Sequence, residues 1–168
     1  KSFKKFFANT KKINKVDFEF QTGGSAKFKK ICVNLMPHAL SFFHVFLKKN
    51  FLKKNITKNS ILVKKHIWKV NFNLSKIIIN LIFKENYQKK TSLKLKFNDL
   101  ILVRKTLKNK GKFINYIQNY KTNKRKNINN PMAEFYKEFF KNLNNTKYYQ
   151  TNKNLTFDIM KKNYFFLN

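Results

Sequence analysis

The stretch IWKVNFNL, residues 67–74, carries the clearest structural pattern in this chain. Its apolar side chains, from Trp68 to Leu74, alternate with one lysine and two asparagines. This period of two is typical of a strand with one buried and one solvent-facing side. The apolar character continues back to residue 61, so we predict a strand over residues 61–74 and a core beneath it.

Two further apolar segments come after this strand. Residues 93–97 alternate apolar side chains with Lys94 and Lys96, and Asn98-Asp99 is a plausible tight turn into the apolar residues 100–103. This arrangement predicts a β-hairpin. The apolar run at 77–83 is too short to distinguish a strand from a helix by periodicity.

The helices are predicted from spacing and capping signals. Pro37 suits the first position of a helix that continues to Phe51, and residues 27–35 before it resemble a short strand. Residues 113–120 are predicted to form one or two helical turns. A last helix is expected over 131–143, because Pro131 follows a possible Asn130 cap and an apolar stripe repeats at helical spacing.

These elements predict an α+β fold, with one compact domain in which helices pack on a small sheet. The expected organisation has five segments along the chain. They are a basic N-terminal arm at 1–30, an α+β core at 31–120, a basic linker at 121–130, an amphipathic helix at 131–143 and a C-terminal extension at 144–168.

The net charge of the chain restricts the classes of function that are expected. The 168 residues carry 38 Lys+Arg against 7 Asp+Glu, a formal net charge of +31. We therefore do not expect an acidic or neutral metabolic enzyme. We expect a chain that binds a polyanionic partner. A disordered tail is excluded too, because 42% of residues are hydrophobic and 17% aromatic.

The stretches without acids point to RNA phosphates as the partner, since lysines neutralise phosphates without reading base sequence. No acid occurs between Glu19 and Glu85 or between Asp99 and Glu134. The candidate RNA-binding residues in these gaps are Lys27, Lys29, Lys30, Arg104, Lys105, Lys108, Lys110, Lys112, Lys121, Lys124, Arg125 and Lys126. Phe113, Tyr116 and Tyr120 lie between them and either stack on unpaired bases or pack in the core.

The segment QTGGSAKFKK, residues 21–30, has two interpretations. Paired glycines followed by Ser25 are typical of an ordinary turn, but they also offer backbone N–H groups to a phosphate beside three lysines. The spacing of a P-loop is absent. Both interpretations stay open at this point.

The sequence gives little support for catalysis, metal binding or cofactor binding. One cysteine, Cys32, and three histidines at distant positions do not make a zinc motif, and no nucleophile signature is present. Glu134 and Glu138 share a helix face, where helix electrostatics is the simpler role. From the sequence we expect no catalytic residue, metal, cofactor or small-molecule substrate, and a chain that is not an enzyme.

Membrane insertion is not expected either. The longest stretch without charge, residues 31–47, is shorter and more polar than a bilayer span of about 20 apolar residues. A single cysteine allows no intrachain disulfide, which is compatible with a reducing compartment.

Lys, Asn, Phe and Ile dominate the composition, and only Arg104 and Arg125 are arginines. This composition resembles that of ribosomal proteins encoded in AT-rich protist mitochondrial genomes. Residues 6–12, FFANTKK, are similar to the WFANTK opening of the KH-containing small-subunit ribosomal protein family, and residues 52–83 loosely match the next part of that family's sequence. The family's Gly-x-x-Gly loop is absent from this chain.

The resemblance implies a structural constituent of a mitochondrial ribosome on the matrix side, bound to rRNA and to neighbouring ribosomal proteins. Two alternatives remain at this stage. One is an accessory subunit of an inner-membrane respiratory complex, and the other is a degenerate nucleic-acid enzyme such as a maturase. The sequence does not identify the ribosomal subunit or the rRNA helices.

Overall fold

The computed structural model describes residues 13–46, 56–109, 112–128 and 131–167. Within them, three helices and eight strands form, in the order β1–α1–β2–β3–β4–β5–β6–β7–β8–α2–α3. The helices are α1 (Lys29–Phe46), α2 (Pro131–Lys141) and α3 (Thr146–Leu167). The strands are β1 (Lys15–Thr22), β2 (Ile56–Lys64), β3 (Ile67–Leu74), β4 (Ile77–Glu85), β5 (Ser92–Phe97), β6 (Leu100–Asn109), β7 (Lys112–Asn119) and β8 (Arg125–Ile128).

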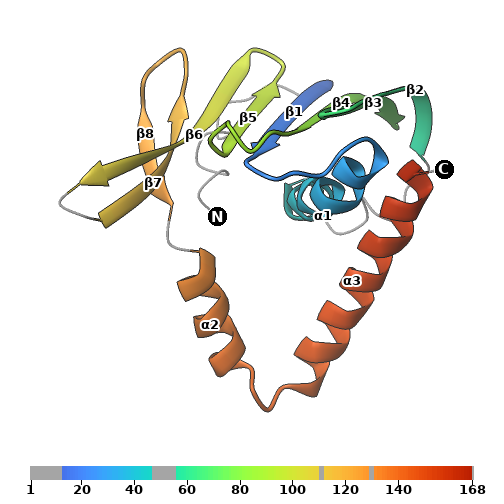
Figure 1. The fold of residues 1–168 in the computed structure, drawn as a ribbon. Coiled ribbons are helices and arrows are strands. Elements are labelled where there is room, and N and C mark those ends of the chain that lie inside the picture. The colour runs from blue at the N-terminus through green and yellow to red at the C-terminus, as the bar shows by residue number, and fades with distance from the viewer. Residues whose placement is uncertain (1–12, 47–55, 110–111, 129–130, 168) are drawn as a thin grey trace.

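All eight strands belong to one mixed sheet, in the spatial order β2-β3-β4-β1-β5-β6-β7-β8 (Figure 1). β1 lies at its centre, parallel to β4 and antiparallel to β5, while the other neighbours pair antiparallel. Short turns join most strands, and helix α1 makes the crossover that follows β1. The sheet is thus two antiparallel meanders joined on either side of β1.

The predicted fold class is therefore wrong. We expected a small sheet with basic extensions at both ends, but one large eight-stranded sheet organises the chain. Its central strand, β1, comes from the segment predicted as an N-terminal arm. The segment KVDFEFQT alternates apolar Val16 and Phe18 with Asp17 and Glu19, a strand pattern hidden among flanking lysines.

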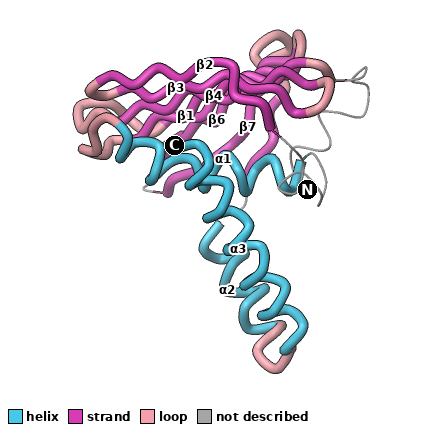
Figure 2. The backbone as a smooth tube through the Cα atoms, turned by 90° about the vertical axis from the view of Figure 1, so that its right-hand side faces the viewer, coloured by secondary structure: helices cyan, strands magenta, loops and turns pink. Residues whose placement is uncertain are grey.

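Helix α1 and the C-terminal end of α3 pack on one face of the sheet (Figure 2). The strands present to them Trp68, Phe72 and Phe83, all almost fully buried, and α1 adds Phe43. Trp68 stacks on Phe83 with ring centroids 5.7 Å apart. Burial of side chains of this size accounts for most of the stability of such a core.

Pro37 lies inside α1, not at its start. A proline there leaves the carbonyl oxygen of Val33 without its usual helical donor. The side-chain amide of Asn163 in α3 donates to that oxygen at 3.3 Å. The helix tolerates the proline because its neighbour supplies the missing hydrogen bond, which also ties α3 to α1.

Other local predictions also differ from the structure. Residues 27–35 contain the start of α1 instead of a strand, and 61–74 divide into the β2–β3 hairpin. Residues 113–120 lie almost wholly in strand β7, whose Tyr116 and Ile117 are both buried, which removes the alternation of a half-buried strand. The 77–83 run is strand β4, the 93–103 hairpin forms as predicted, and α2 begins at Pro131. The FFANTKK segment lies outside the described residues.

Helices α2 and α3 together form an arm that extends away from the sheet (Figure 1). The C-terminal part of α3 returns to the body, where Phe166 packs against Phe72 with ring centroids 5.0 Å apart. Farther out, Phe140 on α2 and Phe157 and Met160 on α3 are exposed. Apolar residues thus occur on more than one side of α3, which explains why its periodicity is not evident from the sequence.

Candidate nucleic-acid interface

The second face of the sheet carries the side chains that alternate with the buried ones. They include lysines, asparagines and acids, and also Ile82 on β4 and the exposed Ile61 and Leu62 on β2. A groove of about 800 Å³ runs over this open face. We define the open face by the side chains of β1, β2, β3, β4 and β5 that lie on the side of the groove. Its lysines are Lys15, Lys69, Lys94 and Lys96.

A ladder of side-chain amides crosses the open face. Asn59 donates to Asn71 at 2.6 Å, Asn71 donates to Asn80, and Asn80 donates to the carboxylate of Asp17 at 2.5 Å. The ladder joins four neighbouring strands, from β2 to β1. It holds these amides in place, and Lys15, Lys69, Lys94 and Lys96 lie around them.

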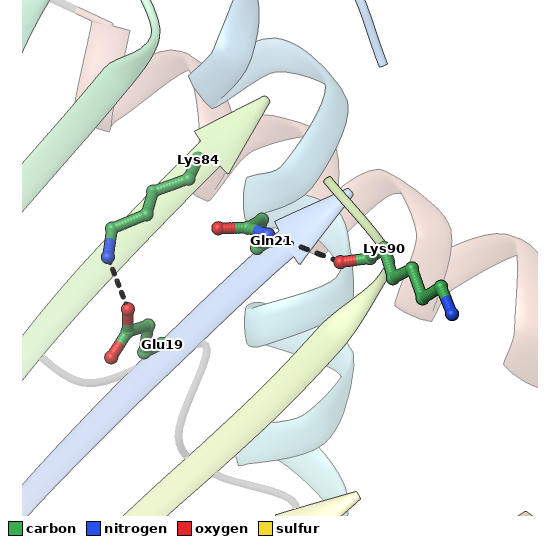
Figure 3. A network of polar contacts seen from close by, with 4 residues as sticks. All are labelled: Glu19, Gln21, Lys84 and Lys90. Carbon is green, nitrogen blue, oxygen red and sulfur yellow. Dashed lines mark hydrogen bonds and ion pairs between the residues drawn. The ribbon is translucent and has the colours of Figure 1, made fainter. Parts of the chain in front are cut away.

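Both carboxylates on this face have cationic or amide partners. Glu19 forms an ion pair with Lys84, 2.5 Å away on the neighbouring strand β4 (Figure 3), and Lys94 lies opposite it on β5. Asp17 accepts from Asn80 and lies opposite Lys96. Opposite charges in register across strands attract. Lysines outnumber these two acids, so the open face keeps a net positive charge.

Figure 3 also shows a contact that fixes the end of β1. The side-chain amide of Gln21 donates to the backbone oxygen of Lys90, just before β5, at 3.2 Å. The ammonium end of Lys90 extends away from the sheet. This contact joins the end of β1 to the segment that leads into β5.

Two predicted RNA-binding residues extend the open face toward β8. Strand register places Lys105 and Arg125 on the same side of the sheet as Lys94 and Lys96. Arg125 lies over the ring of Tyr116, 5.3 Å from its centroid, which is a cation–π arrangement. Tyr116 is thus a packed residue, which decides between the two roles left open for it.

The remaining predicted residues are dispersed. By register, Arg104 and Lys126 belong to the other side of the sheet, and Arg104 donates to Asn115 at 3.4 Å. Lys121 and Lys124 are exposed in the turn between β7 and β8, within the segment predicted as a linker. Lys108 and Lys112 lie in the paired ends of β6 and β7, and Lys110 is outside the described residues.

Lys27, Lys29 and Lys30 gather at the other end of the sheet, in and after the loop that precedes α1. The carboxylate of Glu85, almost fully buried, accepts the backbone N–H of Ala26 at 2.7 Å and the side-chain amide of Asn34 at 3.2 Å. A Cβ on Gly24 would lie 2.3 Å from this carboxylate. A side chain at position 24 would have to displace this carboxylate, which anchors the loop through its hydrogen bonds.

The sequence did not single out the four lysines of the open face. The alternation at 67–74 and 93–97 does place Lys69, Lys94 and Lys96 on the solvent side of their strands. The sequence does not show that β3 and β5 belong to one sheet, on either side of β4 and β1. That arrangement places their lysines on the same uncovered face.

Other chemical groups do not cluster in the described parts of the chain. No three His, Cys, Asp or Glu residues there lie close enough together to hold a metal ion. Burial raises the pKa of Cys32 to about 12, so its thiol stays protonated at neutral pH. Among the described helices, none has the length and apolar character to cross a membrane.

Comparison with known proteins assigns no family to the chain. No family model matches it, and no curated protein matches its sequence. A dehydrogenase from Clostridium difficile is 9% identical over 75% of this chain, with a TM-score of 0.47. A 3-ketoreductase from Actinomadura kijaniata, solved with TDP-benzene and NADP, is 7% identical over 76%, with a TM-score of 0.46. The aligned part is 42% of each of these proteins, and likeness at this level assigns neither activity nor ligand.

One expectation is nevertheless corrected by these comparisons. From the sequence we expected a chain that is not an enzyme. The two solved structures are a dehydrogenase and a 3-ketoreductase, which are enzymes. The exclusion of enzymatic activity is therefore withdrawn.

Proposed function

We propose that this chain is a structural, rRNA-binding constituent of a mitochondrial ribosome, located on the matrix side. The observation that carries the proposal is the division of the sheet into two faces. One face is covered by helices, and the other holds Lys15, Lys69, Lys94 and Lys96 around a groove. Its carboxylates, Asp17 and Glu19, already have partners.

This face suits the RNA backbone for a physical reason. Phosphate neutralisation by lysine releases bound counterions, and that release supplies most of the affinity of sequence-independent binding. A sheet with rows of lysines offers several such contacts without any rearrangement of the backbone. The net charge of +31 adds long-range attraction to the same partner.

The arm formed by α2 and α3 supports the second part of the proposal, contact with neighbouring ribosomal proteins. Exposed Phe140 and Leu143, on and just after α2, and Phe157, Met160 and Tyr164 on α3 lie outside the core. Exposed apolar groups of this size favour contact with another surface over contact with water. We expect neighbouring proteins to cover them in the assembled particle.

RNA binding is tested by comparing two variants that remove the same charge. The first replaces Lys15, Lys69, Lys94 and Lys96 with glutamine, and the second replaces four exposed lysines of the arm. The arm lysines are Lys141, Lys147, Lys153 and Lys161. We expect the open-face variant to lose well over tenfold in affinity for an rRNA fragment, and the arm variant to lose much less. Equal losses would mean that charge alone, and not this face, determines binding.

The ribosomal part is tested by sedimentation of the tagged chain in extracts of the mitochondria that contain it. We expect the chain to sediment with one ribosomal subunit and to leave it when high salt strips proteins from rRNA. Migration with respiratory complexes, and absence from both subunits, would contradict the proposal.

A further inference from the structure

We propose that the segment 25–30 binds an unpaired nucleotide of RNA, with the ring of Phe28 stacked on the base and the surrounding lysines on the flanking phosphates. This inference rests on the proposed function and deepens it. It states that one part of the chain recognises single-stranded RNA, whereas the open face contacts the backbone of any RNA.

The first observation is the exposure of an aromatic ring at a fixed place. Phe28 is 54% exposed, although apolar positions close to it, such as Ile31 and Cys32, are fully buried. Its backbone has a φ of 52°, and its N–H donates to the carbonyl oxygen of Lys65 at 3.1 Å. The ring is thus held at the surface by its own backbone and by the β2–β3 turn.

The second observation is the charge around the ring. Lys27, Lys29 and Lys30 flank Phe28 in the sequence, while Lys64 ends β2 and Lys65 lies in the adjoining turn. All five are exposed. At residues 25–30 and 64–66 the ionisable side chains are five lysines and His66, and the nearby carboxylate of Glu85 is buried and hydrogen-bonded, so the surface suits a polyanion.

The third observation is that the loop at this site is preformed. A hollow of about 680 Å³ lies at this segment, and the described residues that line it are 25–30. Buried Glu85 fixes its floor by accepting the N–H of Ala26, and the missing side chain at Gly24 makes room for that carboxylate. A loop held in this way loses little further freedom when it binds a ligand.

These features together favour single-stranded RNA over other occupants. An aromatic ring can stack on a base only when that base is unpaired, and every base has a suitable face. Lysines beside the ring then reach the phosphates on either side of the stacked nucleotide. The open face, by contrast, presents lysines, amides and aliphatic side chains around its groove, and the aromatic residue in its lining, Phe18, is almost fully buried. This face therefore discriminates little between paired and unpaired RNA.

The test uses the full chain with two probes, a short uridine oligonucleotide and a fully paired RNA duplex. We expect Phe28→Leu to weaken binding of the oligonucleotide by about tenfold, as loss of one base–aromatic stack does, and binding of the duplex by less than about twofold. Phe28→Trp should keep the affinity, and its indole emission should fall as the oligonucleotide binds. Trp68 is buried in the core and contributes a constant background.

Phe157→Leu is the matched control, because Phe157 is 57% exposed and has the ammonium group of Lys161 4.4 Å from its ring centroid. We expect this variant to bind both probes as the unmodified chain does. An equal loss from Phe28→Leu and Phe157→Leu would overturn the inference. So would an equal loss for oligonucleotide and duplex, or displacement of the oligonucleotide by polyglutamate as readily as by unlabelled RNA.

The same measurements separate this inference from the proposed function. If Phe28→Leu changes nothing while the open-face variant loses RNA, the subsite is refuted and the proposed function stands. If neither variant changes RNA binding, both are refuted.

Discussion

The two faces of the sheet use the same strands for opposite purposes. On β3, Trp68 and Phe72 point under α1 and α3 and are almost fully buried, whereas Lys69 and Asn71 belong to the open face. Each strand thus specifies two surfaces by alternation alone. The helices decide which surface becomes core, and the sequence of the strands decides what the other surface carries.

The difference between the faces shows that sheet pairing gathers lysines from separate strands on one face. Of the lysines on the open face, Lys94 and Lys96 come from β5 and Lys69 from β3, yet pairing through β4 and β1 joins them. A face with this composition cannot be buried against an apolar layer without loss of solvation of its charges. The open face is therefore exposed because its charged side chains need water around them.

The covered face is disrupted most directly by Phe72→Ala. This side chain is fully buried and packs against Phe166, so we expect a loss of about 3–5 kcal/mol in the free energy of unfolding. The matched change on the open side of the same strand, Asn73→Ala, should cost less than about 1 kcal/mol. Urea denaturation followed by circular dichroism measures both. Similar losses would show that the two faces are not distinct.

The anchored loop is disrupted by Gly24→Ala. The added Cβ would lie 2.3 Å from the carboxylate of Glu85 and would displace a buried group from its donors. We expect a loss of about 1–3 kcal/mol in the free energy of unfolding, together with weaker binding of the uridine oligonucleotide. Gly23→Ala is the control, because its Cβ would lie 3.3 Å from the carbonyl oxygen of Lys89, a tight contact that needs a shift of only a few tenths of an ångström and leaves Glu85 in place. A harmless Gly24→Ala would contradict the role given to Glu85.

The contact between the two covering helices is measured by a double-mutant cycle on Pro37 and Asn163. Asn163→Ala removes the donor to the carbonyl oxygen of Val33 and should cost about 1 kcal/mol. Pro37→Ala restores a backbone N–H for that oxygen, so the same change should cost much less in its background. Additive effects in thermal or urea unfolding would refute the compensation.

The smallest structural effect concerns Cys32, which reports on how closed the covered face is. Burial raises its pKa from 9.0 to about 12, and only the thiolate reacts with alkylating reagents. We expect almost no alkylation of the folded chain near neutral pH and rapid alkylation in denaturant, read by mass spectrometry. Because the folded pKa is raised, this group's contribution to stability is complete below the unfolded pKa and is lost as the pH rises toward the folded value. Fast labelling of the folded protein would show an open core.

The sequence predicted the parts of the fold that have one buried and one exposed side. The β5–β6 hairpin and the start of α2 at Pro131 follow from alternation, turn residues and capping, which act locally. Strand β7 was missed because Tyr116 and Ile117 are buried on opposite sides, and α3 because apolar residues occur on more than one of its sides. The size of the sheet depends on long-range pairing through β1, which no local pattern reports.

The candidate site was predicted only in part for the same reason. Lys105 and Arg125 join the open face, and Lys27, Lys29 and Lys30 surround Phe28, whereas Arg104 and Lys126 lie on the other side of the sheet. The side of a strand that a lysine occupies can be counted from the sequence. Which side the helices leave uncovered depends on how distant segments pack.

The salt dependence of RNA binding bears most directly on the role of the open face. Each phosphate neutralised on single-stranded RNA contributes about 0.7 to the slope of log affinity against log salt concentration. Replacing Lys15, Lys69, Lys94 and Lys96 with glutamine should therefore make that slope shallower by about 3. The variant of the four arm lysines should keep the slope of the unmodified chain. An unchanged slope for the open-face variant, or equal changes for both, would contradict the assignment of the open face as the RNA-binding surface.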